Sequence, residues 1–239
     1  MNIKISKEQH DRLQASGVDS YLVGSHLYGT NTETSDKDYL CVYNTSSVFS
    51  NAMSGTLMGL PNIHQFQYTE DNVDYLYTSD TQFWKNFFSG DSTINVDAVL
   101  YLLFDKDELV EDPKLSEAVL KVCRSYNIIK AFIGFAKRDI KIWAKNKSNK
   151  KLFHIYRGFY MADCLLRNVY PQLDEIRELT EGDFGLETLE ELNAEEVRLR
   201  TLCNTMFNNG DLLRYNFLPV EDDLLTLLLE SNNTKEFKY

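Results

Sequence analysis

The stretch Val23-Gly24-Ser25-His26-Leu27-Tyr28-Gly29, followed after a polar loop by Ser35-Asp36-Lys37-Asp38-Tyr39, decides the fold. Aromatic and β-branched residues predict one strand that ends at Val23 and a second over residues 39–43, with a Gly-Ser turn leaving the first strand. Side chains two positions apart in a strand point to the same face of the sheet. Asp36 and Asp38 are therefore expected side by side, facing the loop that carries Gly24 and Ser25.

Two neighbouring aspartates of this kind have a chemical requirement. Like charges this close repel one another unless a cation lies between them, and Mg²⁺ favours oxygen ligands, a few carboxylates plus substrate phosphates. The backbone N–H groups of a Gly-Ser turn can bind a phosphate. The pattern predicts a site for a metal-bound nucleoside triphosphate, with Asp36 and Asp38 on the metal and Gly24 and Ser25 on the nucleotide. The alternative interpretation of Asp36 and Asp38 is an ordinary Ser-Asp turn in a loop, without a metal.

A site for two metal ions needs a third carboxylate from a neighbouring strand. Asp74 is the first choice, because it interrupts the alternating run Val73–Tyr77, where an isolated acid inside a strand needs a reason. The alternative for Asp74 is an exposed acid at the start of an edge strand. Asp97 is the second choice for the third ligand, because it lies in the largely apolar run Ile94–Tyr101. It could equally be an acid in the first turn of a helix.

Residues 24–43, GSHLYGTNTETSDKDYLCVY, resemble the nucleotidyltransferase superfamily that includes DNA polymerase beta. They are most similar to bacterial and phage predicted nucleotidyltransferases, in which Gly-Ser-x-x-Tyr-Gly and Ser-Asp-x-Asp recur. Residues 73–99, residues 150–166 (KKLFHIYRGFYMADCLL) and Leu218-Pro219 resemble later blocks of that family. Residues 73–99 depart from the family pattern, with Gly90-Asp91-Ser92 and Asp97 in place of Gly-Asn-Pro and Glu.

The resemblance implies a Mg²⁺-dependent enzyme with Asp36, Asp38 and Asp74 as its catalytic and metal-binding residues. It would transfer a nucleoside monophosphate from an NTP to an acceptor hydroxyl and release pyrophosphate, with two metal ions in the site. The resemblance does not decide the acceptor, which is either a nucleic-acid 3′ end, such as that of tRNA, or a protein side chain. One alternative is a catalytically inactive module of the same fold that binds a nucleotide or a partner. Another is a helical interaction protein whose acidic segment, residues 174–196, binds a basic partner.

Positive charge is concentrated in one part of an acidic chain. The net charge is −11, yet residues 137–151 hold seven Lys or Arg against one Asp, so this stretch is +6 and the remainder is −17. Local asymmetry of this kind favours an anion-binding surface, and a solvated helix face is the alternative. Nucleotide-binding candidates in and after this stretch are Lys150, Lys151, His154 and Arg157, of which the last two lie three residues apart on one helical face. A histidine packed at the edge of the core is the alternative for His154.

Composition bounds the class of protein. The chain has 239 residues and 43% hydrophobic content, enough for one large domain or two small ones. No apolar run approaches the length of a membrane span, and the four cysteines lack C-x-x-C spacing. We therefore expect a cytoplasmic protein without a membrane anchor and with reduced thiols.

Strand patterns come first in the chain and helix patterns follow. This order predicts an α+β fold: a small mixed-sheet nucleotidyltransferase domain in residues 1–110, then a helical bundle in residues 111–239. Expected strands are residues 20–23, 39–43, 64–68 and 73–77, with a loop at residues 55–62. Expected helices are residues 7–16, 81–88 and 152–168, one long helix from Pro113 past Trp143 that bends near Gly134, and one that begins at Asn193. Residues 97–104 are a helix or a buried strand.

Overall fold

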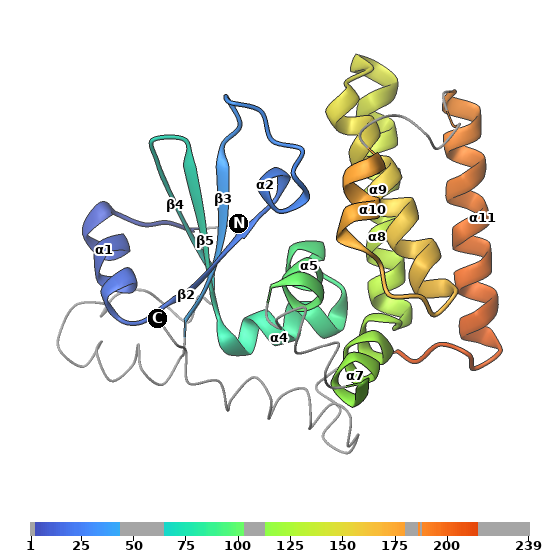
Figure 1. Cartoon of the computed structure of the whole chain (residues 1–239), viewed down its shortest axis with the longest axis horizontal. Helices are drawn as coiled ribbons and strands as arrows, with labels where there is room; N and C mark the ends of the chain where they lie inside the picture. Colours follow the sequence, from blue (N-terminus) through green and yellow to red (C-terminus); the bar gives the residue numbers. More distant parts are fainter. Residues whose placement is uncertain (1–2, 44–64, 103–112, 180–185, 187, 215–239) are drawn as a thin grey trace. The chain divides into compact units, whose positions relative to one another are not determined.

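A computed structural model describes residues 3–43, 65–102, 113–179, 186 and 188–214 (Figure 1). The chain divides into two compact units, Met1–Asn86 (unit 1) and Phe87–Tyr239 (unit 2). The boundary expected at residue 110, the loop at residues 55–62 and Leu218-Pro219 lie outside the described residues. Within the described ranges, no helix combines the length and the apolar character that crossing a bilayer requires.

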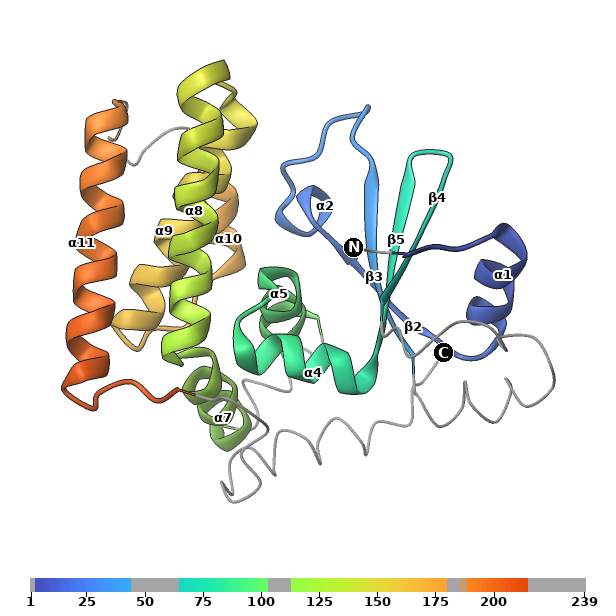
Figure 2. The same cartoon turned by 180° about the vertical axis from the view of Figure 1, so that it is seen from behind.

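Unit 1 is built on a five-stranded mixed sheet with the order β1-β4-β5-β3-β2 (Figures 1 and 2). The β1–β4 and β3–β5 pairs are parallel, and the β2–β3 and β4–β5 pairs are antiparallel. The α+β class, with a mixed sheet before a helical C-terminal region, is therefore confirmed. The strands are β1 (Ile3–Lys4), β2 (Asp19–Val23), β3 (Lys37–Tyr43), β4 (Gln65–Glu70) and β5 (Val73–Ser79).

The β4–β5 hairpin follows from its turn residues. Asp71 and Asn72 both have a left-handed backbone, with φ of 47° and 63°. Asp and Asn tolerate this conformation better than most residues, and two such residues in a row match the twist of a hairpin. The turn pairs Glu70 with Val73, and that register fixes which side chains of β5 share a face.

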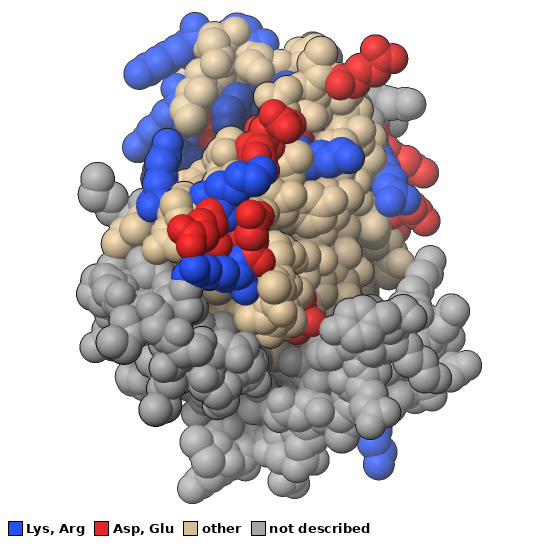
Figure 3. Space-filling view, turned by 90° about the vertical axis from the view of Figure 1, so that its left-hand side faces the viewer, with Lys and Arg blue, Asp and Glu red and all other residues tan. Residues whose placement is uncertain are grey.

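One face of the sheet packs against α1 (Lys7–Ala15) and forms the core of unit 1. Ser6 and Gln9 form a capping box at the start of this helix. The observed bounds agree with the helix expected at residues 7–16. Acidic and basic side chains lie next to one another on this side of unit 1 (Figure 3), and α1 contributes the ion pairs Lys7–Glu70 and Arg12–Glu8. The buried core residues are Ile5, Leu13, Cys41, Tyr43, Phe66 and Tyr77.

Unit 2 is helical, and its centre is the pair α8–α9. A Cβ atom at Gly158 of α9 would lie 2.9 Å from the backbone oxygen of Phe132 in α8, so the absence of a side chain lets the two helices approach closely. Around this pair lie α5, α7, α10 and α11, while α4 spans the division between the units. The bounds are α4 (Asp80–Ser89), α5 (Thr93–Tyr101), α7 (Pro113–Cys123), α8 (Tyr126–Asn146), α9 (Asn149–Leu166), α10 (Leu173–Glu178) and α11 (Leu189–Asn208).

Two expectations about these helices are wrong. The long helix expected from Pro113 is two helices, α7 and α8, because Ser125 stops the first and caps the second by accepting a hydrogen bond from the Ile128 backbone N–H. Gly134 lies within α8, which continues through it. The helix expected from Asn193 begins at Leu189, where Thr188 and Glu191 form the capping box.

Candidate metal and nucleotide site

The sheet of unit 1 brings three aspartates together. In the parallel β3–β5 pair, Asp38 and Asp74 are register partners, and Asp36 lies just before β3. One carboxylate oxygen from each of the three lies within 4.8 Å of the others. The grouping predicted from sequence is therefore present, and we call Asp36, Asp38 and Asp74 the carboxylate cluster. Asp36 is exposed and the other two are half-buried, so solvent reaches the cluster.

Gly24 is adapted to this position in two ways. Val23 pairs with Asp38 across the β2–β3 ladder, so the Gly24 turn begins beside that aspartate. The Gly24 backbone has φ 67° and ψ −143°, a conformation that residues with a Cβ rarely adopt. A Cβ atom here would lie 2.6 Å from Oδ2 of Asp38. Glycine thus both permits the turn and leaves room for the carboxylate, and Ser25 follows at the start of the short helix α2 (Ser25–Tyr28).

Hydrogen bonds hold the parts of the cluster in place. Thr69, the register partner of Asp74 on β4, donates its hydroxyl to Asp74 Oδ1. Oδ2 is thereby the less constrained oxygen of that carboxylate. The Lys37 backbone N–H donates to the Asn72 oxygen at 2.9 Å, which ties the segment with Asp36 to the hairpin of Asp74. Thr69 could not be identified from local pattern, because its contact with Asp74 depends on strand register.

The chemistry of the cluster follows from its composition. Three carboxylates gather at a solvent-reached edge, and within the described ranges neither Asp36 nor Asp74 forms an ion pair with a basic side chain. An all-oxygen donor set that carries three negative charges suits a hard divalent cation such as Mg²⁺. The residues present therefore fit such an ion.

The second candidate for the third carboxylate, Asp97, has a different environment. Asp97 lies on α5 in unit 2, is 3% exposed, and accepts a hydrogen bond from Arg157 Nη1 at 3.2 Å. Arg157 is itself buried and lies over the ring of Phe135, 4.8 Å from its centroid. The acid that interrupts the apolar run Ile94–Tyr101 is thus an ion-pair partner of Arg157 within unit 2.

The basic candidates of α9 surround a carboxylate that the sequence analysis did not single out. Asp139 of α8 has a fully buried side chain, and its Oδ2 accepts hydrogen bonds from Lys151 Nζ at 3.2 Å and His154 Nδ1 at 3.0 Å. Its Oδ1 accepts a hydrogen bond from Arg138 Nε at 2.9 Å. We call Arg138, Asp139, Lys151 and His154 the Asp139 network. Asp139 follows Phe132 and Ala136 on the buried stripe of α8, and that spacing was the available signal.

Electrostatics separates the members of this network. Burial opposes ionisation of Asp139, but the hydrogen bonds from Arg138, His154 and Lys151 outweigh it and lower the pKa of the carboxyl. Burial lowers the pKa of His154 to about 4, and the nearby positive charges of Arg157 and Lys151 act in the same direction. At neutral pH, Asp139 is therefore ionised and His154 is neutral.

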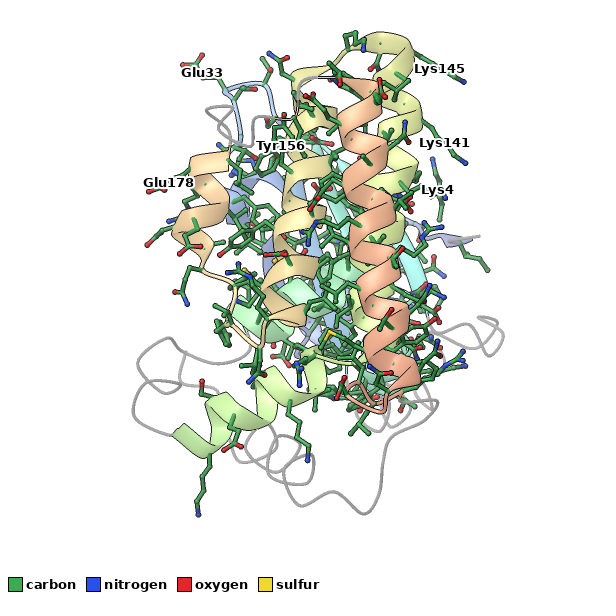
Figure 4. The ribbon with its side chains drawn as sticks, turned by 90° about the vertical axis from the view of Figure 1, so that its right-hand side faces the viewer. Lys4, Glu33, Lys141, Lys145, Tyr156 and Glu178 are labelled. Atoms are coloured by element: carbon green, nitrogen blue, oxygen red, sulfur yellow. The ribbon has the colours of Figure 1, made fainter. Side chains whose placement is uncertain are left out.

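The remaining lysines of the basic stretch reach solvent. Figure 4 shows Lys141 and Lys145 projecting from the C-terminal half of α8, away from the helices of unit 2. Lys150 is exposed in the first turn of α9, while Lys137 lies 3.7 Å from Glu196 of α11. The +6 stretch is thus partly neutralised within unit 2 and partly a solvent-facing basic surface.

Known proteins add nothing to this geometry. Comparison with protein-family models, with curated protein sequences and with solved structures gives no match for this chain. The functional argument therefore depends on the carboxylate cluster, the Gly24 turn and the Asp139 network.

Proposed function

We propose that this protein is a Mg²⁺-dependent nucleotidyltransferase with a fold of the DNA polymerase beta type in unit 1. The observation that carries the proposal is the convergence of Asp36, Asp38 and Asp74 on neighbouring strands beside the Gly24-Ser25 turn. A structural role is a poor explanation for this arrangement, because three carboxylates within 4.8 Å of one another repel in the absence of a cation.

In this proposal each residue has a distinct part. Asp36, Asp38 and Asp74 hold Mg²⁺, two ions in the full site, and Thr69 orients Asp74 through its hydrogen bond to Oδ1. Gly24 leaves room for Asp38 and lets the NTP approach the backbone, and Ser25 offers its hydroxyl and N–H to a phosphate. When bound, such ions stabilise the attacking and leaving oxygens of an in-line displacement.

The basic candidates contribute unequally. Lys150 is exposed and Lys151 is partly exposed, so the side chains of both are accessible to a phosphate group of a ligand. Arg157 is buried in an ion pair with Asp97, so its positive charge is already balanced within unit 2. His154 is neutral at pH 7 and would bind a nucleotide through a hydrogen bond, not through charge.

The acceptor remains a nucleic-acid 3′ hydroxyl, as at a tRNA end, or a protein hydroxyl. The exposed lysines of α8 favour a nucleic acid, because neutralising phosphates supplies most of the affinity for such a partner. The alternative function is an inactive module of the same fold, which would bind nucleotide or partner without turnover.

Incubation of the protein with each labelled NTP, Mg²⁺ and either total RNA or total protein tests the proposal. We expect label transfer to one acceptor class, loss of transfer in EDTA, and loss of transfer in Asp36→Asn and Asp38→Asn. Asp11→Asn is the matched control, since Asp11 is an exposed aspartate of α1 outside the cluster. Full activity in either cluster variant would refute the metal assignment. Metal-dependent NTP binding without transfer would favour the inactive module.

A further inference from the structure

The Asp139 network fixes how His154 presents its second ring nitrogen. An ionised carboxylate can only accept hydrogen bonds, so the His154 Nδ1 atom, 3.0 Å from Asp139 Oδ2, must be the donor. In a neutral imidazole only one nitrogen carries a proton. Nε2 is therefore unprotonated and is a hydrogen-bond acceptor. Within the part of the chain that the structure describes, Nε2 has no hydrogen-bond partner, and the side chain is 24% exposed.

The groups around this acceptor are basic. From α8, Asp139 and the ring of Phe135 lie against the imidazole, and Arg138 binds the other oxygen of Asp139; from α9, Lys151 and Arg157 lie close enough to act on its charge. Asp139 offsets one of these positive charges and the Asp97 carboxylate of α5 offsets that of Arg157. One positive charge remains on the surface of the Asp139 network, supplied by Arg138 and Lys151 together, and exposed Lys150 adds a second at the start of the same helix. A matching ligand carries a negative group and, close to it, a hydrogen-bond donor.

A ribonucleotide has this combination, with phosphates and two ribose hydroxyls. We propose that His154 Nε2 accepts a hydrogen bond from a ribose hydroxyl of a bound ribonucleotide, while Lys151 and Arg138 contact its phosphates. The inference rests on the proposed function in taking a nucleotide as the ligand, and it adds a preference for ribonucleotides over 2′,3′-dideoxyribonucleotides, which lack both hydroxyls. A bare phosphate would gain nothing from Nε2, because both are acceptors.

A purely structural network would have the same contacts within the protein, so the test must isolate Nε2. His154→Asn does so, because its amide N–H can still donate to Asp139 while no acceptor remains at the Nε2 position. Lys151→Ala is the companion variant, which removes a phosphate contact and leaves Nε2 in place. Both are measured in the Asp38→Asn protein with EDTA present, so that neither turnover nor the carboxylate cluster contributes to binding.

The measurement is the Kd of each of the four ribonucleoside triphosphates and of its 2′,3′-dideoxy counterpart. We expect the ribonucleotide to bind about five- to tenfold more tightly than the dideoxy form, the usual size of one neutral hydrogen bond. His154→Asn should abolish this preference and leave the dideoxy affinity unchanged. Lys151→Ala should weaken both ligands by the same factor. The ¹⁵N spectrum of His154 in the free protein at pH 7 should show a protonated Nδ1 and an unprotonated Nε2.

Four results would overturn the inference: equal affinity for the two ligands, a preference that survives His154→Asn, an imidazolium or Nε2-protonated His154 in the free protein, or no binding of any of the four nucleotides. The outcome is separate from that of the proposed function. Ribose discrimination in a protein whose turnover survives Asp38→Asn would contradict the metal assignment and support this site.

Discussion

Unit 1 and unit 2 treat their central carboxylates in opposite ways. In unit 1, three aspartates converge at a solvent-reached edge of the sheet, with oxygens within 4.8 Å of one another. In unit 2, one aspartate, Asp139, is fully buried and accepts hydrogen bonds from three basic side chains. Unit 2 thus satisfies its buried charge with basic side chains of its own, whereas unit 1 gathers three like charges at one edge, where we propose that a cation binds. This contrast separates a proposed ligand site from a network whose charges are paired within the unit.

The same substitution in the two units should have opposite effects on stability. Asp139→Asn leaves Lys151 and Arg138 beside a neutral group and should lower the free energy of unfolding by about 3 kcal/mol. Asp38→Asn relieves repulsion and should leave that free energy unchanged or raise it by about 0.5 kcal/mol. Urea denaturation of both variants without metal checks the pair. A loss of stability in Asp38→Asn as large as that in Asp139→Asn would remove the distinction between the units.

A methyl group at Gly24 should damage the unit 1 site more than its fold. Gly24→Ala combines a left-handed φ with a Cβ atom 2.6 Å from Asp38 Oδ2, and should cost about 2–3 kcal/mol of stability. Gly17→Ala is the matched control, because Gly17 also has a left-handed φ, of 80°, but open space around its Cβ position. Only Gly24→Ala should weaken binding of Mg²⁺, measured by calorimetry. Equal weakening in both variants would assign the effect to backbone strain alone.

Acid should destabilise unit 2 through His154. Its pKa of about 4 in the folded chain lies below the value of about 6.5 expected when unfolded, so the unfolded chain binds more protons between these pH values. The contribution of His154 to stability is therefore complete above pH 6.5 and is lost as the pH falls to 4. Wild type should lose about 1–2 kcal/mol relative to the non-titrating His154→Asn over this range, allowing for partial exposure. Parallel stability profiles for the two proteins would show that His154 titrates normally.

The smallest effect concerns Thr69, which touches the cluster only through Asp74. Thr69→Val removes the hydroxyl donor and keeps the β-branched shape, and should weaken binding of Mg²⁺ by about tenfold, as loss of a ligand-orienting hydrogen bond does. Thr69→Ser retains the hydroxyl and should restore most of the affinity. Thermal unfolding without metal should hardly change in either variant, since Thr69 is exposed. Wild-type affinity in Thr69→Val would show that Asp74 needs no orientation.

Local periodicity explains what the sequence could predict. Alternation in the strand patterns predicted Asp38 and Asp74 on one face, with Asp36 two residues before Asp38, and the pairing of β3 with β5 makes Asp38 and Asp74 neighbours. The short break between the strands expected at residues 64–68 and 73–77 also follows a local rule, because Asp71 and Asn72 are residues that tolerate a left-handed backbone.

Contacts between distant segments explain what the sequence could not. Helical spacing continues from α7 into α8, so the stop at Ser125 depends on a cap that the pattern alone does not reveal. Thr188 and Asn193 both have a glutamate three residues later, and the structure uses the first pair as the capping box. The pairing of Asp97 with Arg157 required knowing that α5 packs near α9, which no local pattern encodes.

The strand order of unit 1 has a consequence for folding. Asp38 and Asp74 belong to strands that are neighbours in the sheet but not in the chain, β3 and β5. An unfolded chain does not hold these carboxylates together, so a cation bound by the cluster would bind the folded unit alone. Such a ligand stabilises the folded state by about 2.7 kcal/mol when its free concentration is 100 times Kd. Metal starvation would thus expose unit 1 to proteolysis, and the abundance of the protein in a cell would follow the supply of divalent cation.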